Sequence, residues 1–248
     1  MIKLSFFILG SIIGSFLNVC IYRMPRSESL VKPRSRCVHC QKAIKWYENI
    51  PLISYIVLSG KCSACKKPIS PRYFIVEFLT AALFVLFYIK FGLTFDLLFF
   101  LIMLCGLIVA TFIDFEHQLI PDTVSFGGLA LGLAVNAFKG RAIFLNSLSG
   151  AVIGGLSIYV IGVIGKFIFK KEAMGFGDVK FLAMIGSFLG WEKTLLVFFL
   201  APFFGAPVGL FLKLRHKAET IPYGPYLSLA TVVVILWGEK ILIKLFYF

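Results

Sequence analysis

Charged residues are scarce in this chain. Asp, Glu, Lys and Arg together make up only 15% of its 248 residues, whereas 59% are hydrophobic. No water-soluble core can hide so large an apolar share, so we expect lipid to surround much of the chain. Backbone groups in lipid must pair within the protein, which requires spanning helices. The sequence therefore predicts an all-α polytopic membrane protein.

Acidic residues are fewer than basic residues. The chain has 12 acidic and 25 basic residues, which gives a formal charge of +13. Such an excess can indicate nucleic-acid binding, but here the basic residues gather in short segments between apolar runs. That pattern orients membrane proteins, so we expect a lipid bilayer and no nucleic acid as a partner. A glycine-rich nucleotide motif after a strand is also missing.

Eight apolar runs approach the ~20 residues that a helix needs to cross the bilayer. They cover residues 4–22, 73–91, 95–113, 123–138, 147–169, 179–191, 194–212 and 224–246. The count falls to six or seven if the short runs 123–138 and 179–191 re-enter or merge. If segment 23–72 faces the cytoplasm, 18 of the 25 basic residues lie on that side, and both termini lie outside.

The longest polar segment, residues 23–72, contains four cysteines in two C-x2-C pairs separated by 21 residues: Cys37, Cys40, Cys62 and Cys65. This spacing is typical of two zinc knuckles that share one tetrahedral Zn²⁺. Four thiolates leave no position for water, so we expect a structural zinc. Two disulfides are the alternative. We expect three parts: helix 1–22, the cytoplasmic zinc loop 23–72 and a transmembrane domain 73–248.

Two aspartates stand where apolar runs meet polar sequence. Asp114 ends the run LIMLCGLIVATFID, and Asp178 lies in MGFGDVKFLAMIG. An ionisable group at the bilayer edge is costly unless it has a task or a partner. Two carboxylates held together can share one proton and activate water, although either one alone could simply cap a helix. Gly175 and Gly177, just before Asp178, permit positive φ or the close approach of another chain.

Seven segments extend this pattern over nearly the whole chain: GSFLNVCIYRMP (14–25), RSRCVHC (34–40), WYENIPLISY (46–55), GKCSACKKPISPRYFIVE (60–77), FIDFEHQLIPD (112–122), MGFGDVK (174–180) and IPYGPYL (221–227). In these segments and their order the chain resembles the type IV prepilin peptidases. These are the bifunctional leader peptidases and N-methyltransferases of pilus and type II secretion systems.

The resemblance implies a GxGD-type aspartic endopeptidase of the bacterial inner membrane. Asp114 and Asp178 would be its catalytic dyad, and Gly175, Gly177 and Lys180 would support the catalytic loop. It implies prepilin or pseudopilin substrates, which would lose a basic leader at the cytoplasmic membrane edge. The new N-terminal residue would then be methylated with S-adenosylmethionine.

The resemblance also implies three candidate polar contacts for S-adenosylmethionine: Asn18, Arg23 and Glu77. Asn18 could instead join two helices by a hydrogen bond, and Glu77 could favour the start of a helix. Glu77 is also a candidate, with Glu116 and Asp122, to receive the basic leader.

Two other functions fit the residues alone: a proton-coupled transporter, and a non-catalytic assembly factor with a zinc docking loop. The sequence indicates neither the oligomeric state nor which aspartate acts as the base.

Overall fold

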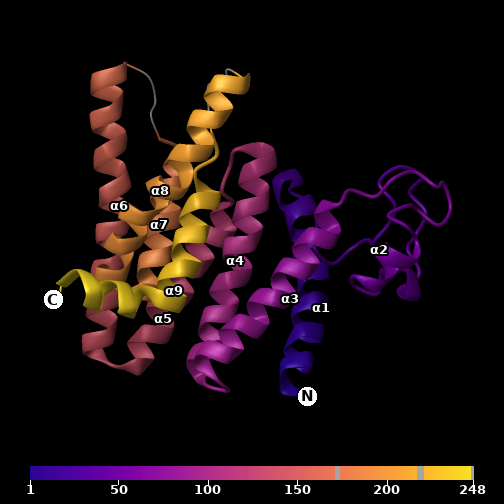
Figure 1. Ribbon diagram of the computed structural model, residues 1–248, viewed down its shortest axis with the longest axis horizontal. Helices are drawn as coiled ribbons and strands as arrows, with labels where there is room; N and C mark the ends of the chain where they lie inside the picture. The colour runs from indigo at the N-terminus through magenta and orange to yellow at the C-terminus, as the bar shows by residue number, and fades with distance from the viewer. Residues whose placement is uncertain (171–173, 217–220, 247–248) are drawn as a thin grey trace. The chain divides into compact units, whose positions relative to one another are not determined.

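The computed structural model describes residues 1–170, 174–216 and 221–246, and in these ranges its regular structure is helical apart from two isolated β-bridges (Figure 1). The chain divides into two compact units, Met1–Val109 and Ala110–Phe248. The division falls inside helix α4 (Phe95–His117), so each unit holds a part of that helix. The two units are described in turn.

The first unit contains a close helix pair, α1 (Ile2–Arg23) and α3 (Arg72–Phe91). Two glycines on α1 allow the contact. A Cβ atom on Gly10 would lie 2.7 Å from the Cα atom of Ala81, and one on Gly14 would lie 2.8 Å from the Cα atom of Glu77. Small residues at such a face let helices in lipid approach closely, so this pair depends on glycine at both positions.

Between α1 and α3 runs the polar loop, which has little regular structure. It contains two short 3-10 turns, η1 (Met24–Arg26) and η2 (Trp46–Asn49), and one short helix, α2 (Ile53–Val57). The two bridges, Arg36 with Ala43 and Lys61 with Pro68, close the two cysteine knuckles.

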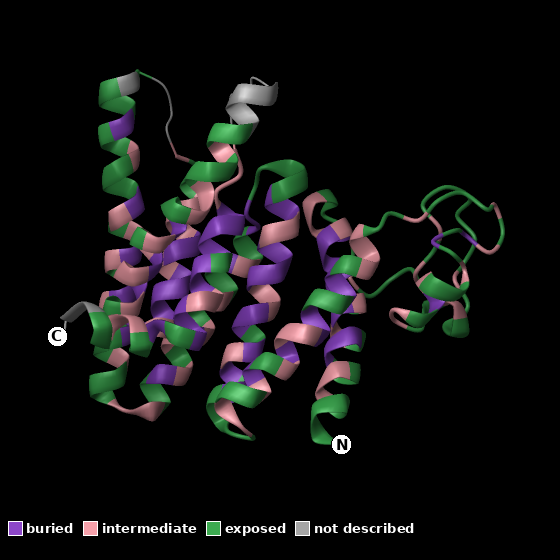
Figure 2. Cartoon of the chain, viewed as in Figure 1, coloured by how far each residue is buried: buried purple, intermediate pink, exposed green. Residues whose placement is uncertain are grey.

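The second unit packs its remaining helices around α7 (Phe176–Leu189), whose residues 181–188 are buried except Ala183 (Figure 2). Its other helices are α5 (Asp122–Lys139), α6 (Arg141–Phe169), α8 (Trp191–His216) and α9 (Gly224–Phe246). Polar side chains join them: Asn136 on α5 donates to the carbonyl of Ser187 on α7 at 2.9 Å.

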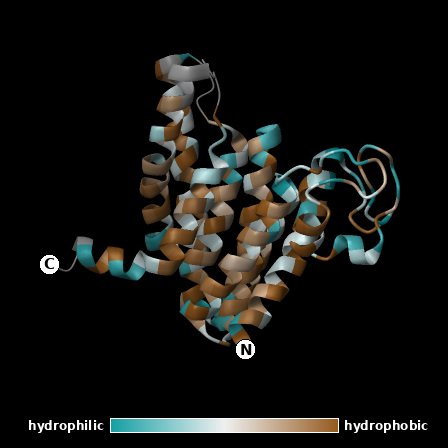
Figure 3. Ribbon diagram, turned by 45° about the vertical axis from the view of Figure 1, so that its right-hand side comes forward, coloured by the Kyte–Doolittle hydropathy of each residue, from teal (hydrophilic) through white to brown (hydrophobic). Residues whose placement is uncertain are grey.

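All eight predicted apolar runs are helices, and the all-α prediction is confirmed. Six of them are long and apolar enough to cross a membrane, at Ile2–Arg26, Arg72–Phe91, Phe95–His117, Arg141–Ile168, Trp191–Phe211 and Gly224–Lys244. Helices α5 and α7 are not among these six, and they correspond to the two runs noted as short. Figure 3 shows the hydrophobic cover of the long helices, and large side chains on them such as Phe16 and Phe199 are exposed. Outward apolar side chains are expected of a multi-pass membrane protein.

Candidate active site and metal centre

Asp114 lies in the last turns of α4, and its carboxylate is buried at 5% exposure. Its Oδ2 atom accepts a hydrogen bond of 2.9 Å from the backbone N–H of Gly224, the first residue of α9. A Cβ atom on Gly224 would lie 2.9 Å from that same oxygen and 3.2 Å from Cδ1 of Ile120. The segment IPYGPYL therefore closes directly on Asp114, and only glycine leaves room for the contact.

Asp178 lies in the first turn of α7 and is half-buried. The N–H of Gly175 donates to its carboxylate, while its own N–H donates to the Gly175 carbonyl at 3.1 Å. Gly175 has an ordinary extended backbone, and Gly177 is not among the positive-φ residues. Of the two possibilities that glycine permits here, positive φ is not used. A Cβ atom on Gly177 would be 3.5 Å from Ile120, an ordinary contact distance, so Ile120 lies close beside this glycine.

The structure brings the two aspartates together. Ile120 approaches both Gly177, beside Asp178, and Gly224, which is bonded to Asp114. The two carboxylates are close enough for the negative charge of Asp114 to act on Asp178. Two acids in such proximity resist joint ionisation, so the pair holds a proton more readily than either would alone.

Tyr223 adds a polar group beside this pair. Burial, and then the negative charge of Asp178, raise the pKa of Tyr223 to about 12. Its hydroxyl therefore stays protonated at neutral pH and can donate a hydrogen bond. The sequence analysis includes IPYGPYL among the matched segments but assigns no role to Tyr223 or Gly224. The matched motif was the only signal for them.

Lys180 does not contact the carboxylate of Asp178 by any described interaction. Its ammonium forms an ion pair with Asp122 in the first turn of α5, and it lies 5.4 Å and 5.5 Å from the ring centres of Phe126 and Phe176. The pair joins the start of α7, which carries Asp178, to the start of α5, which follows the α4 helix that carries Asp114. Asp122 therefore already has one basic partner, although its side chain remains 64% exposed.

The four loop cysteines form one cluster, with their sulfur atoms within 4.8 Å of one another. The Sγ distances are 3.9 Å between Cys37 and Cys65 and 4.0 Å between Cys40 and Cys62. Four sulfurs around a tetrahedral Zn²⁺ at about 2.3 Å would be about 3.8 Å apart. A disulfide needs about 2.05 Å, and the four thiols are free. The predicted cluster is confirmed, and its donor set fits a metal ion.

The two knuckles repeat one backbone design. In the first, the N–H of Cys37 donates to the carbonyl of Lys42, and Gln41 has positive φ. In the second, Cys62 donates to Lys67, and Lys66 has positive φ. Backbone N–H groups of Cys65 and Ala64 donate to the Cys62 sulfur and lower the pKa of that thiol to about 6. A thiolate is the form that binds metal.

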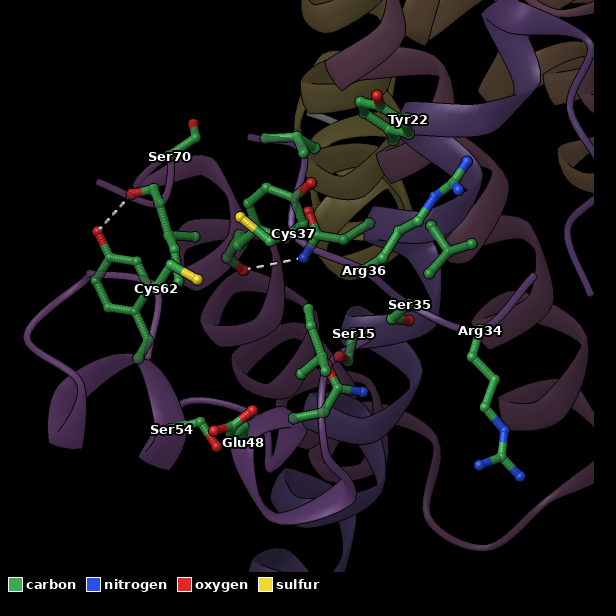
Figure 4. Close-up of a pocket in the computed structure, with 18 of the residues that line it drawn as sticks. Ser15, Tyr22, Arg34, Ser35, Arg36, Cys37, Glu48, Ser54, Cys62 and Ser70 are labelled. Carbon is green, nitrogen blue, oxygen red and sulfur yellow. Dashed lines mark hydrogen bonds between the residues drawn. The ribbon is translucent and has the colours of Figure 1, made fainter. Parts of the chain in front are cut away.

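A cavity of about 1120 Å³ opens between the loop, α1 and the start of α3, and all three candidate cofactor contacts line it. Figure 4 shows Arg34 and Arg36 on one side of it and Cys37 and Cys62 on the other. Its volume is slightly above the range of about 300–1,000 Å³ that is usual for small-molecule sites. The cavity thus brings together Asn18, Arg23 and Glu77, which stand far apart in the sequence.

Each of the three makes a different contact. Asn18 is 1% exposed and donates to the carbonyl of Tyr73 at 3.0 Å, while its Oδ1 atom accepts no hydrogen bond among the described residues. Arg23 donates to the carbonyls of Ser29 and Pro33, both at 2.7 Å, so it holds the loop. Glu77 accepts from the N–H of Leu52 at 2.8 Å and is also occupied. Of these three side chains, Asn18 is the one with a buried oxygen that accepts no hydrogen bond from the described residues.

Two family models match the chain. The bacterial peptidase A24 N-terminal domain covers residues 8–91, and the type IV leader peptidase family covers residues 101–210. Among curated proteins, the prepilin leader peptidase/N-methyltransferases of Stutzerimonas stutzeri and Pseudomonas aeruginosa are each 38% identical over 94% of this chain and 90% of their own length. That of Myxococcus xanthus is 41% identical over 84% of this chain and 62% of its own length. No solved structure matches.

Proposed function

Because this chain belongs to the type IV prepilin leader peptidase/N-methyltransferase family, we propose that Asp114 and Asp178 are the dyad of its peptidase activity. The protein is a prepilin peptidase with N-methyltransferase activity, so the transporter and assembly-factor interpretations are set aside. The proximity of the two carboxylates supports this proposal most directly: Gly224 is hydrogen-bonded to Asp114, and Ile120 lies beside both Gly224 and Gly177, the neighbour of Asp178.

The two aspartates share one proton, so one acts as a base and the other as an acid. One aspartate, ionised, takes a proton from water, and the resulting hydroxide attacks the scissile carbonyl carbon. The other, protonated, donates a hydrogen bond to the carbonyl oxygen as negative charge develops there. As the C–N bond breaks, the leaving nitrogen takes the proton that the first aspartate received from water, which gives a carboxyl group on the leader and a free α-amine. Tyr223, held neutral, supplies a second donor near Asp178.

Asparagine variants test the dyad. Asp114→Asn and Asp178→Asn keep the side-chain volume but remove the shared acid, so each should abolish leader removal. The assay is the mass of a purified prepilin after incubation with the detergent-solubilised enzyme. An Asp114→Asn or Asp178→Asn enzyme that still shortens the prepilin would contradict the assignment. Methylation of a mature pilin supplied without its leader should survive in both variants and shows that they fold.

Methyl transfer is assigned to the cavity of the first unit. S-adenosylmethionine supplies a methyl group on a sulfonium, which an unprotonated α-amine can take directly. The buried Oδ1 of Asn18 fits a donor group of such a cofactor, since a buried acceptor without a partner is costly. Asn18→Ala should therefore weaken binding of radiolabelled S-adenosylmethionine and methylation while leaving cleavage unchanged. If Asn18→Ala bound S-adenosylmethionine as well as the parent protein, the assignment of Asn18 would be wrong.

The metal in the cysteine cluster is proposed to be a structural zinc. The tetrahedral spacing of the four sulfurs supports it. Four thiolates complete the coordination shell, so the metal would hold the loop rather than activate water. Atomic emission analysis of the purified protein should find one zinc per chain.

The position in the cell follows from the charge pattern. We place the protein in the bacterial inner membrane, with the cysteine loop and both aspartates on the cytoplasmic side, where the lysines and arginines are concentrated. Reporter fusions at each loop test this orientation. Of the three acids considered for the basic leader, we retain Glu116 as the candidate because it is exposed and lies two residues beyond Asp114. Its reversal to lysine should weaken the dependence of cleavage on leader charge.

A further inference from the structure

Helix α2 presents its apolar side chains outward and its polar side chain inward. Ile53, Ile56 and Val57 are 58%, 65% and 74% exposed, whereas Ser54 is buried and donates to the Tyr47 carbonyl at 3.0 Å. The α2 segment is largely exposed in Figure 2. A contiguous exposed apolar patch marks a surface that meets another apolar medium. Ile53, Ile56 and Val57 are called the α2 face below.

The residue before α2 is fixed to the side of the α1–α3 pair, well inside the helix ends. Leu52 donates its N–H to Oε2 of Glu77, and the Ser15 hydroxyl also bonds Glu77. Ser15 precedes Arg23, the last residue of α1, by about 12 Å at the helical rise of 1.5 Å per residue. Glu77 similarly lies about 8 Å beyond Arg72, the first residue of α3.

The backbone at this anchor is strained. Leu52 has φ 63° and ψ −49°, and the N–H of Ile53 donates to the Pro51 carbonyl at 2.7 Å, which makes a γ-turn. A leucine rarely adopts this conformation and keeps it only where its surroundings enforce it. Glu77 supplies that enforcement through its bond to the Leu52 amide. The level of α2 along the helix pair is therefore set by specific contacts rather than by the length of the loop.

We propose that the α2 face lies in the bilayer, at the boundary between headgroups and acyl chains of the leaflet nearest the cysteine loop. Helices α1 and α3 are both candidate spans, so a segment anchored about 8 to 12 Å inside their ends reaches the depth of an interfacial helix.

The composition of the loop favours lipid over a protein partner. Residues 24–71 contain nine basic and two acidic residues, which suits anionic headgroups. The exposed aromatic side chains Trp46 and Tyr47 lie in η2, which packs against α2, and such side chains are enriched at membrane interfaces. The three side chains of the α2 face do not line the cavity, whereas Ser54 and Tyr55 of the same helix do, so the membrane contact would hold one wall of the cavity at the bilayer surface.

Tryptophan fluorescence tests the depth of the α2 face. The full-length protein is reconstituted into vesicles of phosphatidylcholine and phosphatidylglycerol after its three tryptophans are replaced (Trp46→Phe, Trp191→Phe, Trp237→Phe). A single reporter is then introduced by Val57→Trp. We expect phosphatidylcholine brominated on the acyl chains to remove most of its emission, and aqueous acrylamide to remove little.

The matched control is Lys42→Trp in the same background, since Lys42 is an exposed position of the first cysteine knuckle. It should respond in the opposite way, to acrylamide and not to brominated lipid. If the Val57→Trp protein does not fold, as judged by loss of prepilin cleavage, the natural Trp46 kept alone serves as the reporter, with the same expectation.

Two results would overturn the proposal. One is a reporter at position 57 that acrylamide reaches as readily as the control. The other is a reporter that ignores brominated lipid and changes its emission only when prepilin is added, since the α2 face would then bind substrate.

Discussion

Replacement of Gly224 by alanine isolates the contact between IPYGPYL and Asp114. Gly224 is not among the positive-φ residues, so alanine is compatible with its backbone and the substitution tests space alone. The added Cβ would lie 2.9 Å from Oδ2 of Asp114 and 3.2 Å from Ile120. The first distance is shorter than Cβ atoms tolerate, so α9 or the carboxylate must move and the hydrogen bond must lengthen.

The expected loss of cleavage rate follows from the strength of the hydrogen bond between Gly224 and Asp114. A hydrogen bond to a charged group contributes about 1.5–3 kcal/mol. If all of it is lost in the transition state, cleavage slows by about 10- to 150-fold. The effect should appear in kcat rather than KM, because Gly224 touches the carboxylate and the substrate need not bind less well. Methylation of a mature pilin, whose proposed site is in the other unit, should be unchanged.

The assay is the initial rate of leader removal over a range of prepilin concentrations. Gly127→Ala is the matched control, since Gly127 lies in α5 and a Cβ there would meet no atom within 4 Å. That variant should keep its cleavage rate and gain up to about 1 kcal/mol of stability from better helix propensity. A Gly224→Ala enzyme with the kcat of the parent would refute the claim that the Gly224 contact holds Asp114 for catalysis.

Three further outcomes are expected. Cys62→Ser, or removal of zinc by a chelator, should release the loop and abolish methylation, with a smaller effect on cleavage. Equal loss of both activities would argue against a separate methyl-transfer site. Lys180→Ala should change the free energy of unfolding by no more than about 1 kcal/mol, because the pair with Asp122 is partly exposed, yet it should lower kcat for cleavage. The charge swap Asp122→Lys with Lys180→Asp should restore part of that loss, and failure to restore it would show that the ion pair is not the cause. Tyr223→Phe should slow cleavage without moving the alkaline limb of the pH profile. The pKa of Tyr223 in the parent protein is about 12, above the ordinary value of 10. The hydroxyl therefore stays neutral below pH 10 and loses its proton only as the pH rises through 12. A limb that moved in Tyr223→Phe would show that this hydroxyl titrates within the working range.

The helices were predictable because their signal is local. Each apolar run is read from consecutive residues, and lipid requires such runs to be helical, so even the short runs 123–138 and 179–191 were found as α5 and α7. The cysteine cluster was predictable for a similar reason, since two C-x2-C turns can each form independently before one metal joins them.

The contacts within the sites were not predictable in this way. Gly224 bonds a carboxylate 110 positions earlier, and Glu77 bonds the amide of Leu52 across 25 positions. No periodicity encodes such pairs. The positive φ of Leu52 is likewise hidden, because leucine has no preference for it and the anchor imposes it from outside. The reading of Glu77 as a cofactor contact or a helix-start acid missed its role as the anchor of α2.

The chemistry of the two reactions argues for two separate sites. An α-amine has an unperturbed pKa of about 8, and it must lose its proton before it can take a methyl group. Beside Asp114 and Asp178, at least one of which is ionised, the amine would be held as ammonium and would react slowly. The cavity of the first unit also contains acids, Glu28, Glu48 and Glu77, but the basic side chains Arg23, Arg34, Arg36 and Lys67 line it with them. The product of cleavage should therefore leave the dyad before it is methylated, and a variant without its dyad should still methylate a pilin that arrives already cleaved.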